Sequence, residues 1–201
     1  MKIFTIGHSN HSIEKFIDLL KQHQISAIAD VRSTPYSRYN QQYNQEKLKH
    51  ELRRNNISYS FLGKELGARS DNPNCYEENK VVYDKIAQTE EFLKGLKRLK
   101  KGLKQYNIAL MCAEKDPINC HRAILISRYL KKNKIDIWHI LPNGQLESQT
   151  ELEQRLIAFF ELNLSQQLNL FEQNINFTKS EEELIEEAYT LQGEKIAYLQ
   201  E

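Results

Sequence analysis

The sequence predicts an α/β protein: a mostly parallel, Rossmann-like three-layer sheet with helices on both faces, followed by a C-terminal appendage. Short apolar segments typical of strands alternate with amphipathic segments of helical period over residues 1–163, and this alternation is typical of parallel sheets. The 201 residues are enough for one domain with a substantial core and an appendage. We therefore expect an α/β domain over residues 1–163 and a tail over residues 164–201.

The first part of the chain predicts three strands and two helices. Ser12 is expected to cap the first helix, because its side chain can accept a hydrogen bond from the first turn. A polar, aromatic loop and a second helix ending near Arg54 follow the second strand. The expected strands are Lys2–Gly7, Ile25–Val31 and Ile57–Leu62.

The next part predicts a long loop over Gly63–Asn79 and a long helix over Val81–Tyr106, broken near Gly95 or Gly102. Thr150 and Glu153 have the spacing of a capping box, which predicts a further helix ending near Leu162. The remaining expected elements are strands over Asn107–Cys112 and Ile135–Leu141, with a helix over Pro117–Lys132 between them.

Composition and charge point to a soluble cytoplasmic protein. Lys and Arg number 28 and Asp and Glu 27, so the net charge of +1 exerts no overall pull toward nucleic acid or a membrane. No apolar run approaches the ~20 residues that a membrane span needs, so we expect no membrane partner. Three cysteines favour reduced thiols over a disulfide framework.

Polar side chains follow four of the expected strands where each strand ends. In a parallel sheet these ends share one edge, and ligands bind there near the point where the strand order reverses. We therefore expect a cleft lined by these groups. They are His8 and Ser9 after the first strand, Asp30 and Arg32 after the second, Cys112 and Glu114 after the fourth, and His139 near the end of the fifth.

The segment from Ile108 to Arg122 carries the densest group of reactive side chains. Asp116 is expected to cap a helix whose first position is Pro117, since proline lacks the N–H that would be unpaired there. Cys120, His121 and Arg122 would then lie near the positive end of that helix.

Four sequence blocks resemble those of an uncharacterised bacterial and archaeal family, domain of unknown function number 488 (DUF-488). The resemblance covers roughly residues 1–145 with the blocks in the expected order, and it implies family membership without an activity. The blocks are Thr5-Ile-Gly7-His8-Ser9, Asp30-Val-Arg32, Pro35-Tyr-Ser37-Arg38 and Cys112-Ala-Glu-x-x-Pro-x-x-Cys120-His-Arg122.

The residue types suggest roles within the expected cleft. Asp30 or Glu114 is the candidate general base, and His8 or His121 the proton carrier. A mutual ion pair that closes the strand end is an equally good interpretation of Asp30 and Arg32. The candidates for holding a substrate through anionic or polar contacts are Ser9, Arg32, Ser37, Arg38, Cys112 and Arg122.

Thiol and metal chemistry are further possibilities. Cys120 has an environment that lowers a thiol pKa, so it is a candidate nucleophile, whereas Cys112 also fits a small apolar core residue. Cys75, Cys112, Cys120, His8 and His121 lack a Cys-x-x-Cys pair or a His-x-x-x-His pair, so no metal site is expected. One glycine beside His8 is too few for a nucleotide-binding loop, so no cofactor is expected.

The tail suggests a protein partner. Residues 167–171 are similar to the Gln-Leu-x-Leu-Phe peptide by which bacterial polymerases and repair proteins dock on the replication sliding clamp. An alternative is that these residues anchor the tail to the domain. Ser180 is expected to open an acidic helix running to about Tyr198. The clamp-binding residues would be Gln167, Leu168, Leu170 and Phe171.

These observations lead to one functional hypothesis and two alternatives. The leading one is a hydrolase of glycosidic or phosphoester bonds that acts on nucleic acid or a nucleotide-like substrate, in DNA repair, and is recruited by the clamp. DNA is a possible partner because residues 94–104 are rich in lysine, although such a stripe is also typical of a solvated helix face. The alternatives are a non-catalytic module that binds a nucleotide or anion, and a thiol-dependent enzyme using Cys120 or Cys112.

Overall fold

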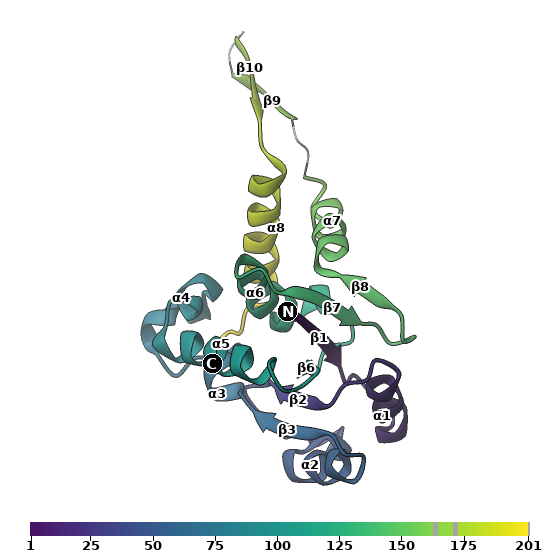
Figure 1. The fold of residues 1–201 in the computed structure, drawn as a ribbon. Helices are drawn as coiled ribbons and strands as arrows, with labels where there is room; N and C mark the ends of the chain where they lie inside the picture. The colour runs from purple at the N-terminus through teal and green to yellow at the C-terminus, as the bar shows by residue number, and fades with distance from the viewer. Residues whose placement is uncertain (163–164, 171–172, 201) are drawn as a thin grey trace.

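The computed structural model describes residues 1–162, 165–170 and 173–200, with the backbone alone over 165–170 and 173–178. A six-stranded sheet forms the centre in the order β3-β2-β6-β1-β7-β8 (Figure 1). Every pairing in it is parallel except that of β8 with β7. The strands are β1 (Lys2–Gly7), β2 (Ala27–Asp30), β3 (Ser58–Phe61), β6 (Ile108–Cys112), β7 (Asp136–Ile140) and β8 (Leu146–Ser148).

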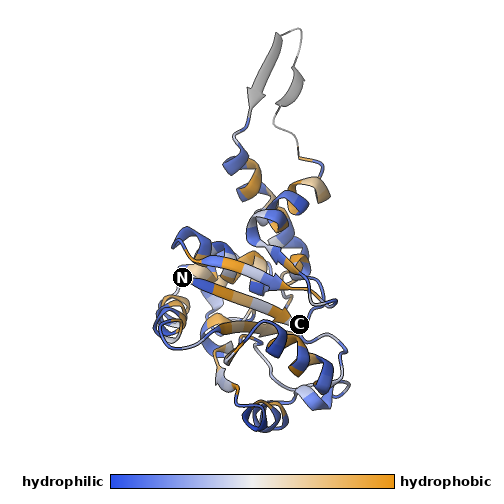
Figure 2. Ribbon diagram, turned by 45° about the vertical axis from the view of Figure 1, so that its right-hand side comes forward, coloured by the Kyte–Doolittle hydropathy of each residue, from blue (hydrophilic) through white to orange (hydrophobic). Residues whose placement is uncertain are grey.

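Helices cover both faces of this sheet, which confirms the predicted three-layer α/β class. One face packs Phe4, Ile28 and Met111 against helices α1 (Ile13–Gln22) and α2 (Gln45–Arg54). The hydropathy colouring in Figure 2 shows the central strands as the most apolar part of the described chain. The opposite face carries α5 (Glu90–Gly102), a π-helical segment (Arg122–Ser127), α6 (Arg128–Lys132) and α8 (Glu181–Ile196).

The long helix expected over residues 81–106 is two helices. Thr89 accepts a hydrogen bond from Phe92 N and starts α5, whereas α4 (Tyr83–Ala87) ends just before it. Of the two expected breaks, the one at Gly95 is wrong because α5 runs through this residue, whereas α5 does end at Gly102. A Cβ at Gly95 would lie 2.7 Å from a methyl group of Leu66, so the glycine lets α3 (Gly63–Leu66) pack closely against α5.

Two further sequence predictions need correction. The expected loop over residues 63–79 contains α3 and β4 (Tyr76–Glu77), which pairs with β5 (Lys80–Val81). The capping box of α7 (Gln149–Phe159) is formed by Ser148 and Glu151, because the short strand β8 delivers the chain to the helix two residues earlier than expected. Ser12 and Ser180 cap α1 and α8 as predicted.

The C-terminal helix belongs to the packed core. Ala188 and Tyr189 of α8 are buried in the main core, beside Leu156 of α7. Beyond α8 the chain runs antiparallel beside β5, where Val81 N donates to Tyr198 O at 2.9 Å. Between α7 and α8, strands β9 (Ser165–Leu170) and β10 (Gln173–Thr178) form an antiparallel pair.

In the described part of the chain, no helix combines the length and the apolar character that crossing a membrane requires.

Candidate active site

A cavity of about 290 Å³ lies at the carboxyl edge of the sheet. The loop after β2 contributes Arg32, and the loop after β6 contributes Glu114. Two adjacent strands there send their chains to opposite faces, since β1 continues to α1 and β6 to the Arg122–Ser127 segment. The cavity therefore occupies the topological switch point, where α/β sheets bind ligands.

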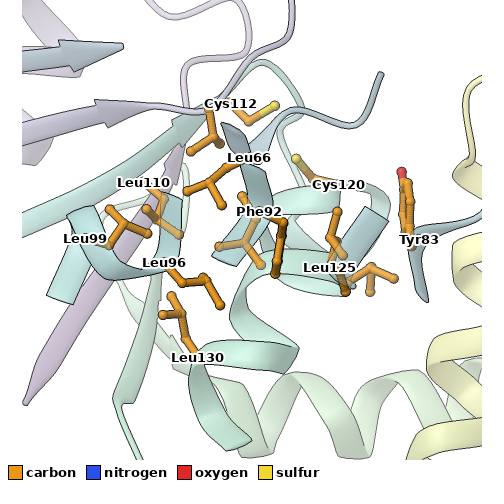
Figure 3. Packing of buried hydrophobic residues seen from close by; sticks show 14 of the residues in the cluster. Leu66, Tyr83, Phe92, Leu96, Leu99, Leu110, Cys112, Cys120, Leu125 and Leu130 are labelled. Atoms are coloured by element: carbon orange, nitrogen blue, oxygen red, sulfur yellow. The ribbon is translucent and has the colours of Figure 1, made fainter. Parts of the chain in front are cut away.

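Four side chains on one side of this cavity form a compact group, termed here the Cys120 cluster: Cys112, Glu114, Cys120 and His121. His121 Nδ1 lies 3.6 Å from Cys112 Sγ and 3.9 Å from Cys120 Sγ. Cys120 Sγ is 2.9 Å from Glu114 Oε2. Figure 3 shows the two sulfur atoms beside each other at one edge of the main core.

Local backbone structure explains how these residues meet. Asp116 caps the short 3₁₀ turn Pro117–Asn119, accepting from Ile118 N at 3.0 Å, but the helix expected from Pro117 does not continue. Cys120 is extended, and its carbonyl accepts from the amides of Ala123 and Ile124, which opens the following helical segment. The expectation that Cys120 sits inside the first helical turn is therefore wrong. It precedes the turn, and this extended backbone places it in the group around His121.

Burial and charge alter the acidities in the Cys120 cluster. Burial opposes ionisation of Cys120, but a hydrogen bond with Cys112, the charge of Arg122 and contact with His121 outweigh it and lower the thiol pKa well below its usual range. Burial, together with the charge of Cys120, raises the pKa of Glu114. Burial also raises the pKa of Cys112. These opposite shifts bring the acidities of Cys120 and Glu114, which are joined by a hydrogen bond, closer together.

His121 is held in a defined tautomer. Its Nε2 lies 3.0 Å from the carbonyl oxygen of Val31, which can only accept, so Nε2 carries the proton. In the neutral ring the lone pair of Nδ1 therefore faces the two sulfur atoms. Burial opposes protonation of this ring, but contact with Cys120 overrides it and raises the His121 pKa.

Arg122 does not line the cavity, contrary to its predicted role as an anion holder. It is fully buried, and it donates to the carbonyl of Glu114 at 2.8 Å and to Thr5 Oγ1 at 3.3 Å. This arrangement needs Gly7, because a Cβ at that position would lie 1.8 Å from the Glu114 carbonyl oxygen. Arg122 thus fixes the loop that carries Glu114 and supplies positive charge behind Cys120.

His139 lies next to the last residue of β7, near the strand end as predicted, but it is fully buried beside Thr5 and does not line the cavity. Thr5 donates to Nδ1 at 2.8 Å, and Nε2 donates to Gln149 at 2.8 Å. Burial, with the charge of Arg122, lowers the His139 pKa to about 3. A buried chain of hydrogen bonds, each donating toward the next member, runs through Arg122, Thr5, His139, Gln149, Tyr189 and Glu153.

A second group, termed here the Asp30 cluster, closes the end of β2: His8, Asp30, Arg32, Tyr43 and Tyr59. Arg32 donates to both carboxylate oxygens of Asp30, at 2.9 and 2.7 Å, and Tyr59 OH donates at 2.8 Å. Asp30 is completely buried, so the structure shows the ion pair that the sequence left open as an alternative to a general base. Arg32 still reaches the cavity lining.

His8 completes the Asp30 cluster. Its ring stacks on Tyr43 at 4.1 Å between centroids, and its Nδ1 donates to Ser9 O at 2.8 Å. Burial lowers the His8 pKa to about 4, although the bond to Ser9 opposes this shift. The ring is therefore neutral near pH 7 and offers Nε2 to Arg32 at 3.4 Å.

The remaining predicted residues lie elsewhere. Ser37 accepts from Tyr39 N and Asn40 N within its own loop, and Arg38 beside it is exposed, so neither lines the cavity. Ser9 donates to Asn10 at 3.3 Å and lies outside the cavity lining. Of the expected clamp-binding residues, Gln167, Leu168 and Leu170 are in β9, and Phe171 lies outside the described residues.

The structure adds residues that sequence analysis missed. Arg69 lies 4.3 Å over the ring of Tyr198, and both line the cavity with Tyr83. Ser33 and Thr34 line it too, and their position directly after Arg32 was a usable signal. No local pattern could associate Tyr198 with this site, because α8 brings it back from the end of the chain.

A family model described as "Domain of unknown function DUF488" matches residues 12–129, more than half of the chain. The chain belongs to the DUF488 family. The matched range contains the Asp30 and Cys120 clusters except His8, whereas α7, α8 and Tyr198 lie beyond it. Searches of curated proteins and of solved structures found no match.

Proposed function

We propose that this DUF488 protein is a hydrolase that acts on nucleic acid or a nucleotide-like anionic substrate bound in the cavity. The observation that carries the proposal is that cationic and acid–base groups line one cavity at the switch point. Arg32 and Arg69 provide positive charge, and Glu114 and His121 provide proton transfer.

Arg69 is the best placed group for holding an anion. Within the described residues its guanidinium has no carboxylate partner within 4.0 Å and stacks on Tyr198. Arginine in this setting offers paired N–H donors that match phosphate oxygens. The guanidinium of Arg32 is held in place by its ion pair with Asp30. Its role is therefore to form part of the cavity wall and to make the electrostatic potential there more positive.

The surface beside the cavity suits a substrate larger than a single phosphate. A groove of about 740 Å³ shares Ser33, Thr34, Arg69 and Tyr198 with the cavity. It adds Lys64 and Tyr36, whose side chain is 59% exposed. An exposed aromatic ring beside cations is a setting in which a nucleobase stacks while its phosphate is held nearby.

Within this proposal Glu114 is the general base. Glu114 is an exposed residue whose carboxyl group borders the cavity, a position that allows proton exchange. Asp30 is not assigned this role because Arg32 and Tyr59 already occupy its oxygens.

We further propose that the protein is recruited to replication or repair sites in the bacterial cytoplasm. This proposal rests on the similarity of residues 167–171 to the clamp-binding peptide. Micromolar affinity for a bacterial sliding clamp, lost in a Leu170→Ala/Phe171→Ala double variant, would support it. Equal affinity in the double variant would contradict it.

A thiol-dependent enzyme is the second candidate. Cys120 lines the cavity, contacts Glu114 and has a lowered pKa, which are properties of a nucleophilic thiol. A covalent intermediate trapped on Cys120 during turnover would favour this candidate over direct hydrolysis by water.

The cavity can be tested with matched arginine variants. Mononucleotides and short damaged or modified DNA oligonucleotides would be screened for binding and cleavage with the full chain. Arg69→Gln should weaken binding by about tenfold or more, since a charge-assisted hydrogen bond contributes about 1.5–3 kcal/mol. Arg38→Gln, which changes an exposed arginine outside the cavity, should bind normally. Equal losses in the two variants would refute the cavity assignment.

A further inference from the structure

We propose that Cys112, Cys120 and His121 bind a divalent transition metal ion of the zinc type, with Glu114 beside its open coordination position. The binding site stands on the geometry of the Cys120 cluster alone. Its use in catalysis deepens the proposed hydrolase and rests on it.

The distances match the edges of a coordination tetrahedron. Zinc–sulfur bonds of about 2.3 Å and zinc–nitrogen bonds of about 2.0 Å place sulfur and nitrogen about 3.5 Å apart. His121 Nδ1 lies 3.6 Å from Cys112 Sγ and 3.9 Å from Cys120 Sγ. The three ligand atoms all lie within 4.8 Å of one another, so one ion reaches them with small side-chain adjustments.

The orientation of His121 is that of a ligand. Histidines that bind metals donate their other ring N–H to a carbonyl or carboxylate, which fixes the tautomer. Here Nε2 donates to Val31 O at 3.0 Å, and Nδ1 is left facing the sulfur atoms. The backbone carbonyl belongs to the segment just after β2, so the sheet itself sets the ring angle.

The charges around the cluster also suit such an ion. Two thiolates and one divalent cation sum to zero, a state that tolerates burial far better than two thiolates alone. The positive charge of Arg122 then balances the negative charge of a Glu114 carboxylate. The two residues are in contact, because Arg122 donates to the backbone carbonyl of Glu114. Within the described residues Arg122 has no side-chain carboxylate partner, which leaves it available for this balance.

Three protein ligands at a cavity wall are typical of catalytic rather than structural zinc sites, which close the fourth position with another side chain. The three proposed metal ligands and Glu114 all line the same cavity. An ion held there lowers the pKa of a bound water. Glu114 takes one proton from that water as the water oxygen bonds to the substrate. The bond between the substrate and the leaving group breaks, and the proton passes from Glu114 to the leaving group. Hydrolysis therefore balances without an oxidant or reductant.

The decisive experiment measures metal in the full chain purified without chelators. We expect one equivalent of zinc per chain in the parent protein and in Cys75→Ser, a matched change to a buried cysteine outside the cluster. Cys112→Ser and Cys120→Ser should lose most of that zinc. Retention of zinc in both cluster variants would overturn the proposal.

Two further measurements use the unmodified chain and so do not depend on whether a variant folds. Zinc K-edge absorption should show two sulfur ligands and at least one nitrogen, and cobalt substitution should give thiolate-to-metal charge-transfer bands. A shell without sulfur, a Cys112–Cys120 disulfide or free thiols in the presence of excess zinc would overturn the site.

The outcomes also separate this inference from the proposed hydrolase. Zinc bound through both cysteines, without Arg69-dependent binding or cleavage of any nucleotide probe, would refute the hydrolase and leave the metal site standing. Nucleotide cleavage that depends on Arg69 in a chain that binds no metal would refute the metal site alone.

Discussion

The Asp30 and Cys120 clusters lie at the same edge of one sheet and start from the same pattern, an acid or thiol two residues before a second polar side chain. They differ in how their polar atoms are used. Arg32 and Tyr59 occupy both oxygens of Asp30. The Cys120 cluster instead joins a thiol and a carboxyl group by a single hydrogen bond, and His121 Nδ1 lies beside two sulfur atoms.

A shifted pKa and close neighbours are therefore not enough to identify a reactive site. His8 in the Asp30 cluster has a strongly lowered pKa, yet its ring is stacked on Tyr43 and bonded at both nitrogens. A closed group of this kind stabilises the strand end. The Cys120 cluster keeps ligand atoms directed at one another and at the cavity, which is the condition for binding a metal ion or a substrate.

The largest expected effect is on the closed cluster. Asp30→Ala leaves Arg32 as an unpaired buried charge, so the free energy of unfolding should fall by about 3–5 kcal/mol. Chemical denaturation followed by circular dichroism measures this. A loss below about 1 kcal/mol would show that the ion pair does not hold the strand end.

The next largest effect is a pH dependence of the free energy of unfolding, which His8 gives to the Asp30 cluster. His8 has a folded pKa of about 4 against 6.5 when exposed, so the unfolded chain binds its proton first as pH falls. Its stabilising contribution is complete above pH 6.5 and declines toward pH 4, by on the order of 3 kcal/mol. Stability measured across this range should decline less in His8→Phe, which keeps the ring stacking. An exposed control, His50→Gln, should follow the parent, and identical pH slopes in His8→Phe and the parent would refute the assignment.

A smaller effect is expected where the Cys120 cluster meets β1. Gly7→Ala forces a methyl group against the Glu114 carbonyl, and the shift required should cost about 2 kcal/mol. The matched change Gly193→Ala meets Tyr83 at an ordinary 3.5 Å and should be neutral or slightly stabilising in its helix. Thermal unfolding of the two variants gives the comparison. Equal stability would show that the β1–loop contact is not tight.

The smallest effect on stability should come from the open cluster itself. Glu114→Gln removes a carboxyl group whose ionisation is already disfavoured by burial, so the free energy of unfolding should change by less than about 1 kcal/mol. Cleavage of any substrate found should nevertheless be lost. Full cleavage by a folded Glu114→Gln protein would remove Glu114 from the mechanism.

Much of the fold followed from patterns within short segments. The parallel sheet with helices on both faces was correctly predicted, because strand and helix periods alternate clearly and Ser12 and Ser180 are effective caps. Strand β8 and the Ser148 cap were missed because the three residues of Leu146–Ser148 carry too few side chains for a period to show.

The site was predicted less completely, for a related reason. Strand ends pointed to Arg32, Cys112 and Glu114, and the reactive segment up to Arg122 pointed to Cys120 and His121; all five line the cavity. Their grouping into a metal site was not predicted, because Cys112 ends β6 and the turn at Pro117–Asn119 is what brings Cys120 and His121 back to it. Arg69 and Tyr198 depend on contacts between distant segments, for which the local sequence carries no signal.

The Cys120 cluster differs from most of the main core in that its side chains line the cavity. The most direct test of this difference is the alkylation rate of each cysteine in the native, metal-free chain, followed by mass spectrometry. Cys75 and Cys120 are equally buried, each 1% exposed, but Cys120 lines the cavity and has a lowered thiol pKa. We therefore expect Cys120 to react far faster than Cys75 and added zinc to suppress its reaction. Equal rates at the two cysteines, unchanged by zinc, would show that the Cys120 cluster is not reactive.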